Sequence, residues 1–326
     1  MIFDNIRRKV FRILLFALLI LLLLYAKDWF FDIPDEAEWA NSIFTGFPDI
    51  LYGRLWTLIS IIPVLINGIL IYKINFDHIS VTGREHLLVW LWAVQVGGFS
   101  FLHPLSGIHF AVAFILLSYD TLFNIYRNTS NYSAIFLSSM YLGIAACFYS
   151  LSLYLFVPYI ISLYRFKIAE LRDWIISIAG FLVPFYFAIF IFHFLTGNWL
   201  YPIETTVNNI IPDSLSAGIA EMRMSQYIFC VFILILVGIK MFIPVKSTGR
   251  RINQKTISCI RSFSVLMFFS ILIFLFFTPE SKFVLPIIFI STTIYLRMLF
   301  VIINKNIIAN SLFILLVIAS AMTLFY

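Results

Sequence analysis

The chain has 326 residues, of which 62% are hydrophobic and only 12% are charged, and its mean hydropathy is +1.00. A soluble domain carries about twice this share of charge, roughly 25%. The composition therefore excludes a water-soluble fold and predicts an all-α, polytopic integral membrane protein. The net charge of +6 does not indicate nucleic-acid binding, because the basic residues lie between apolar segments rather than in one patch.

Three cysteines, Cys147, Cys230 and Cys259, have neither CxxC spacing nor a histidine partner pattern. Their positions predict neither a zinc site nor a disulfide framework. We therefore predict no metal ligands from the sequence, and no pattern in it identifies a cofactor.

Apolar runs bounded by charged or turn residues predict eleven membrane helices. Their ranges are 10–26, 55–72, 87–102, 108–126, 135–149, 151–164, 174–195, 226–243, 262–278, 284–303 and 307–325. The segments 135–149 and 151–164 are shorter than the roughly 20 residues that a bilayer crossing needs, and they meet without a charged turn. Nine full spans plus a re-entrant hairpin is therefore the alternative.

The basic residues predict the orientation of these spans. With a cytoplasmic N-terminus, only Lys27, Arg54, Arg223 and Lys282 of the 22 Lys and Arg residues fall on the outer side. Positive charge is retained on the cytoplasmic side of membrane proteins, so we predict the N-terminus inside and the C-terminus outside. We treat residues 1–326 as a single transmembrane domain with long outer loops at 27–54 and 196–225.

The loop at 27–54 is unusually acidic for so apolar a chain. Six of the sixteen acidic residues lie in it: Asp28, Asp32, Asp35, Glu36, Glu38 and Asp49. The stretch from Ile33 to Ala40 predicts a helix that Pro34 initiates, with acidic residues in the first turn, where the helix dipole favours them. The simplest interpretation is an amphipathic helix at the membrane interface with a solvated acidic side.

The tripeptide Asp35-Glu36-Ala37, shortly after the first span, resembles the acidic pair in the first outer loop of polytopic glycosyltransferases that use polyprenyl-phosphate sugars. In such enzymes a carboxylate acts as the general base for the acceptor or helps to hold a metal near the lipid phosphate. The resemblance implies Asp35 and Glu36 as catalytic residues and a polyprenyl-phosphate-linked sugar as the substrate.

Two histidines, His103 and His109, flank a Pro and Gly turn on the same outer side, and Arg54 opens the second span in that layer. With the carboxylates, these cations could hold an anionic headgroup or a phosphate. The alternative is that they are turn and cap residues at the interface. Their spacing is not the HExxH type that a metal site would require.

Few polar residues lie within the predicted spans: Asn67, Gln95, Asp120, Lys240 and Arg297. Asp120, Lys240 and Arg297 are near the predicted inner boundary, so we expect snorkelling or structural ion pairs. Only Asn67 and Gln95 fall near the midplane, where a coupled transporter would place its site.

A longer pattern, from His103-Pro104 through Phe148-Tyr149 to Arg172-Asp173-Trp174 with Gly180 and Pro184, resembles an uncharacterised family of multi-pass inner-membrane proteins from Bacteroidota. The resemblance implies the inner membrane of a Gram-negative envelope and no particular activity.

Three function classes remain open. The first is an envelope-biogenesis enzyme that handles a lipid-linked saccharide at the periplasmic face, with Asp35, Glu36, Arg54, His103 and His109 as its site. The second is a non-catalytic subunit that packs against other envelope proteins through its aromatic-rich spans and the loop at 196–225. The third is a carrier for a small or lipidic solute.

Overall fold

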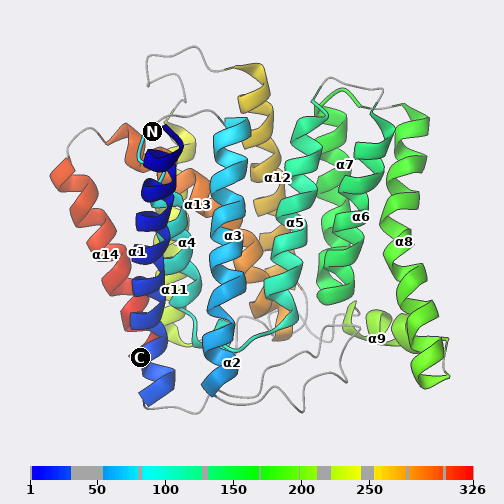
Figure 1. Ribbon diagram of the computed structural model, residues 1–326, viewed down its shortest axis with the longest axis horizontal. Helices are drawn as coiled ribbons and strands as arrows, with labels where there is room; N and C mark the ends of the chain where they lie inside the picture. Colours follow the sequence, from blue (N-terminus) through cyan, green and yellow to red (C-terminus); the bar gives the residue numbers. More distant parts are fainter. Residues whose placement is uncertain are drawn as a thin grey trace.

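The computed structural model describes residues 2–30, 54–79, 83–126, 131–168, 170–197, 199–210, 222–243, 253–276, 279–303 and 306–325. Every regular element within these ranges is a helix (Figure 1). The prediction of an all-α fold is confirmed.

The α-helices, in chain order, are α1 (Ile2–Phe30), α2 (Arg54–Ile59), α3 (Ile61–Ile74), α4 (Leu87–Gly97), α5 (Gly107–Asn124), α6 (Tyr132–Phe148), α7 (Phe156–Arg165), α8 (Leu171–Thr196), α9 (Tyr201–Ile210), α11 (Met224–Phe242), α12 (Gln254–Phe276), α13 (Leu285–Ile302) and α14 (Asn306–Phe325). A π-helix, η1 (Asn75–Ile79), continues α3. Short 3₁₀ helices are η2 (Ser100–Leu102), η3 (Ser150–Leu155) and η5 (Pro279–Val284).

Seven helical segments among the described residues are long and apolar enough to cross a membrane: Thr57–Ile79, Gly107–Asn124, Leu171–Phe194, Met224–Phe242, Gln254–Phe276, Lys282–Ile302 and Asn306–Leu324. Shorter apolar helices cover Phe11–Ala26, Leu87–Gly97 and Tyr132–Phe148. All eleven predicted segments fall on helices, and the chain termini lie at opposite ends of the bundle (Figure 1). The length and composition of these helices support a multi-pass membrane protein, whereas the number of spans stays a prediction.

Helix α13 forms the centre of the bundle. Every side chain from Leu285 to Phe300 is buried, and α13 contacts α4, α11 and α12. A helix that is apolar on all sides is expected at such a position. Its hydroxyl groups join it to neighbouring helices, because Ser291 Oγ donates to the carbonyl of Phe263 at 2.9 Å and Thr292 Oγ1 donates to Oε1 of Gln95 at 2.8 Å.

Helix α4 ends at Gly97, earlier than the predicted segment 87–102. The last carbonyl groups of a helix generally need partners from outside it, and here two hydroxyls of α14 reach the end of α4. Ser320 Oγ donates to the carbonyl of Val94 at 2.8 Å, and Thr323 Oγ1 donates to the carbonyl of Gly98. These hydroxyls allow the chain to leave the helix within a buried environment.

Helices α6 and α8 pack closely through two glycines. A Cβ atom on Gly143 would overlap the backbone oxygen of Phe181, and one on Gly180 would lie 2.5 Å from the backbone oxygen of Phe136. Small residues at such positions let membrane helices approach at backbone distance.

The predicted loop at 196–225 contains a helix, α9, which the sequence analysis did not expect. Helix α9 lies beneath the turn between α6 and η3, and that turn stops short of the lower end of α8 (Figure 1). Contacts of α9 with α8 and η3 hold it there. The sequence of α9 is too short and too polar to predict a membrane span. Its position depends instead on its contacts with α8 and with the hairpin formed by α6, η3 and α7.

Candidate functional site

The predicted outer site is only partly described. Asp35 and Glu36 lie outside the described residues. Arg54 is the first residue of α2, and only its backbone belongs to the described part of the chain. The assignment of these three residues to catalysis and phosphate binding stays a prediction.

His103 directly follows η2, six residues after the end of α4, and is fully buried. Its Nε2 donates to the carbonyl of Gly97 at 2.9 Å, and its ring stacks on Tyr25 with centroids 3.8 Å apart. The carbonyl of His103 accepts a hydrogen bond from Ser60 at 2.5 Å. The ring therefore caps α4 and joins it to α1.

His109, in the first turn of α5, is 4% exposed. Its Nδ1 lies 3.2 Å from Oγ of Ser106, and its carbonyl accepts from Nδ2 of Asn67 at 3.0 Å. Both histidines thus make the turn and cap contacts that were the alternative interpretation of this motif. Ligand binding by either ring stays a prediction.

A second group of ionisable residues gathers at the opposite end of α3, and we call it the carboxylate–histidine cluster. It consists of Lys73, Asp77, His78 and Asp120. The Lys73 ammonium lies 2.8 Å from Oδ2 of Asp120, and Nε2 of His78 lies 3.0 Å from Oδ1 of the same carboxylate. His78 and Asp120 are buried, at 3% and 7% exposure, whereas Asp77 is exposed.

The π-helix η1 brings this cluster together. Lys73 and His78 are five residues apart, so a regular α-helix would turn them about 140° apart, at 100° per residue. The wider π turn places both side chains over Asp120 on α5.

The neighbouring helices fix the backbone of η1. Arg297, which is fully buried on α13, donates from Nη1 to Oδ1 of Asn75 at 2.7 Å and from Nη2 to the carbonyl of Gly83 at 3.0 Å. Thr256 on α12 donates to the carbonyl of His78 at 3.3 Å. Contacts from α12 and α13 therefore fix the position of η1, the segment that carries Asp77 and His78.

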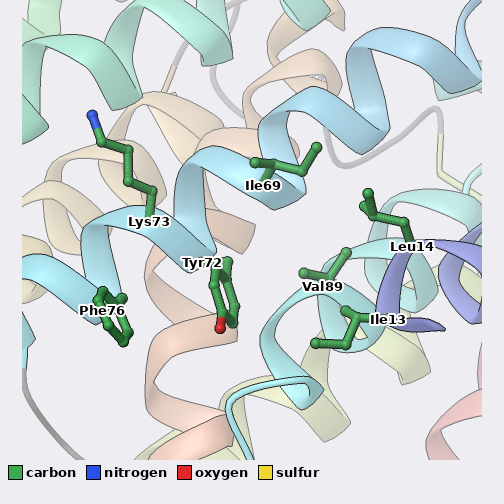
Figure 2. Close-up of a pocket in the computed structure, with 7 residues that line it drawn as sticks. All are labelled: Ile13, Leu14, Ile69, Tyr72, Lys73, Phe76 and Val89. Atoms are coloured by element: carbon green, nitrogen blue, oxygen red, sulfur yellow. The ribbon is translucent and has the colours of Figure 1, made fainter. Parts of the chain in front are cut away.

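An apolar groove of about 270 Å³ lies beside the cluster, between α1, α3 and α4. Its lining residues are Ile13, Leu14, Ile69, Tyr72, Lys73, Phe76 and Val89. Figure 2 shows the Lys73 side chain extending away from Ile13 and Val89, so that its stem borders the groove and its ammonium leaves it. Lys73 is thus shared by the groove and the cluster, and its side chain is 53% exposed.

The sequence analysis identified part of this arrangement. It expected structural ion pairs or snorkelling for the ionisable residues near the inner boundary, and Asp120 does pair with Lys73. Lys240 donates to the carbonyl of Ile243 at 3.1 Å. Asp77 and His78 were not predicted as site residues, because the α-helical period does not place His78 on the same helix face as Lys73. The charged run Lys73 to His78 next to a buried acid was the available signal.

Comparisons of this chain with protein-family models, with curated proteins and with solved structures find no match.

Proposed function

We propose that this chain is a multi-pass protein of the bacterial inner membrane that binds an anionic lipid of the cell envelope, of the class of polyprenyl phosphates and their saccharide-linked forms. The observation that supports the proposal best is the apolar groove between α1, α3 and α4, which leads to the ammonium of Lys73.

The occupant we assign to the groove is a hydrocarbon chain. The surrounding faces of α1 and α3 expose large apolar side chains, among them Phe11 at 66%, Leu15 at 48%, Ile62 at 58% and Ile66 at 46%. Such side chains face lipid in a spanning helix, and a polar ligand would find no hydrogen-bond partner along the apolar walls. A lipid tail suits a groove of this chemistry.

The head group we assign is a phosphate. An ammonium has three N–H donors, and Asp120 accepts from one of them. The half-exposed Lys73 therefore has donors to offer to a phosphate, which forms strong charge-assisted hydrogen bonds. Arg12 is exposed on α1, and it directly precedes the lining residue Ile13 in the sequence.

This proposal places the lipid at the end of the bundle that carries the N-terminus, which the distribution of basic residues predicts to be cytoplasmic. The prediction that Asp35 and Glu36 act on a lipid-linked sugar concerns the opposite, periplasmic end and is independent of the groove. A carrier function is less well supported, because aromatic rings such as Phe99 and Phe289, with centroids 5.4 Å apart, fill the described core.

The test is lipid retention by purified protein, measured by native mass spectrometry during stepwise removal of lipid. The probes are undecaprenyl phosphate, phosphatidylglycerol and zwitterionic phosphatidylethanolamine. We expect the two anionic lipids to be retained longest. Ile69→Trp should fill the groove and weaken retention at least about tenfold, equivalent to about 1.4 kcal/mol.

Ile62→Trp is the matched control, because Ile62 is an exposed residue of the same helix that does not line the groove. Lys73→Met should remove the preference for the anionic lipids and leave binding of the tail. Equal retention by the wild type and Ile69→Trp would sink the proposal, and so would equal retention of all three lipids by the wild type.

A further inference from the structure

We infer that Asp77, His78 and Asp120 form a binding site for a divalent transition-metal ion where α5 meets the π-helix η1. The inference concerns the ion alone and holds whether or not the groove takes a lipid.

The spacing of the donor atoms suits a metal. One ligand atom from each of the three residues lies within 4.8 Å of the other two, and Nε2 of His78 is 3.0 Å from Oδ1 of Asp120. Ligands of a tetrahedral site with bonds near 2.1 Å are separated by about 3.4 Å. His78 and Asp120 are already near this separation, and the exposed Asp77 can rotate inward without disturbing the core.

The state of the His78 ring is compatible with coordination. A carboxylate can only accept hydrogen bonds, so Nε2 carries the proton that points at Asp120. Nδ1 is buried and has no hydrogen-bond partner among the described residues. When a metal takes the lone pair of Nε2, the ring proton can therefore reside on Nδ1 without breaking another contact.

The other oxygen of Asp120 is held in place by a separate group. Lys73 donates to Oδ2 at 2.8 Å, which leaves Oδ1 directed at His78. Ligating carboxylates commonly have such a partner, because it fixes the orientation of the ligand. The anchoring of η1 through Asn75 to Arg297, and through the carbonyl of His78 to Thr256, holds the backbone of two ligands in the same way.

One imidazole and two carboxylates indicate the class of ion. Imidazole suits zinc, copper, iron and nickel, whereas magnesium and calcium prefer sites made of oxygen alone. The exposed position of Asp77 provides an entry path from the membrane surface.

The test is titration of the full chain, purified in detergent without a polyhistidine tag, with Co²⁺ and with Zn²⁺. Binding of Co²⁺ is followed by its visible absorption and binding of Zn²⁺ by calorimetry, with Mg²⁺ as the counter-probe. We expect one Co²⁺ or Zn²⁺ per chain and no competition from Mg²⁺.

Asp77→Asn is the most informative variant, because the exposed side chain can be changed without disturbing the fold. It removes one of the three ligands and should weaken binding of Co²⁺ at least about tenfold, no less than the loss of a supporting group does. His78→Gln and Asp120→Asn should abolish binding. Lys73→Met removes the group that orients Asp120 and should weaken binding about tenfold. His86→Gln, a control histidine outside the cluster, should keep wild-type binding. Absence of Co²⁺ binding in the wild type would overturn the inference, as would wild-type affinity in Asp77→Asn.

Discussion

Gly143 and Gly180 lie where α6 and α8 approach each other most closely, and a larger side chain at either position would disturb that contact. We expect Gly143→Ala and Gly180→Ala to destabilise the protein, because the added methyl group meets backbone atoms of the facing helix. Backbone cannot move aside as a flexible side chain can. Overpacking of this kind costs about 1–3 kcal/mol, and a contact with backbone belongs to the upper half of that range.

The substitution also has a favourable effect, since alanine is better than glycine in a helix interior by about 1 kcal/mol. Gly238→Ala on α11 isolates this effect, because a Cβ atom there has no neighbouring atom within 4 Å. The expected net effects are about 1–2 kcal/mol of destabilisation at positions 143 and 180 and up to about 1 kcal/mol of stabilisation at position 238.

The assay is reversible unfolding in mixed micelles by a denaturing detergent, with the free energy of unfolding compared among the three variants. The contribution of helix propensity cancels in that comparison, so a difference of about 2–3 kcal/mol reports the overlap itself. If Gly143→Ala and Gly180→Ala are as stable as Gly238→Ala, the close approach of α6 and α8 is wrong.

Two further predictions concern the buried arginine and the orientation. Asn75→Leu removes the acceptor for Nη1 of Arg297 and should cost about 1.5–3 kcal/mol, the scale of a hydrogen bond to a charged group. Asn75→Asp keeps an acceptor and should remain stable, so similar unfolding free energies for the two variants would contradict this role. The predicted orientation places the C-terminus on the outer side of the membrane. Alkaline phosphatase fused to Tyr326 should therefore be active, and green fluorescent protein fused there should not fluoresce. The reverse pattern would contradict the predicted orientation.

The helical class of this protein could be predicted from its sequence because the backbone hydrogen bonds of a membrane helix form between residues close together in the chain. Backbone within a bilayer must satisfy its hydrogen bonds inside each segment, so every apolar run long enough to matter is a helix. The eleven predicted segments accordingly fall on helices. Where the sequence analysis missed an element, as at α9, the helix is too polar to be recognised as a span and depends on contacts with α8 and η3.

The roles of the polar residues could not be predicted in the same way. His103 and Asp120 are both polar residues within predominantly apolar segments, and nothing in their local sequence separates a helix cap from an ion pair. The distinction comes from partners that are distant in the chain, Tyr25 for His103 and Lys73 for Asp120.

The helical class of the protein and its suitability for a membrane follow from composition and from the hydrogen-bonding needs of each segment, so both can be derived from the amino-acid sequence. The shared contact of His78 and Lys73 with the Asp120 carboxylate, in contrast, arises from the packing of distant helices. That contact requires a π turn at residues 75–79, which is tied to α12 and α13 through Thr256 and Arg297. A local departure from the α-helical period is stabilised by residues almost two hundred or more positions away, so no pattern within the helix itself reveals it.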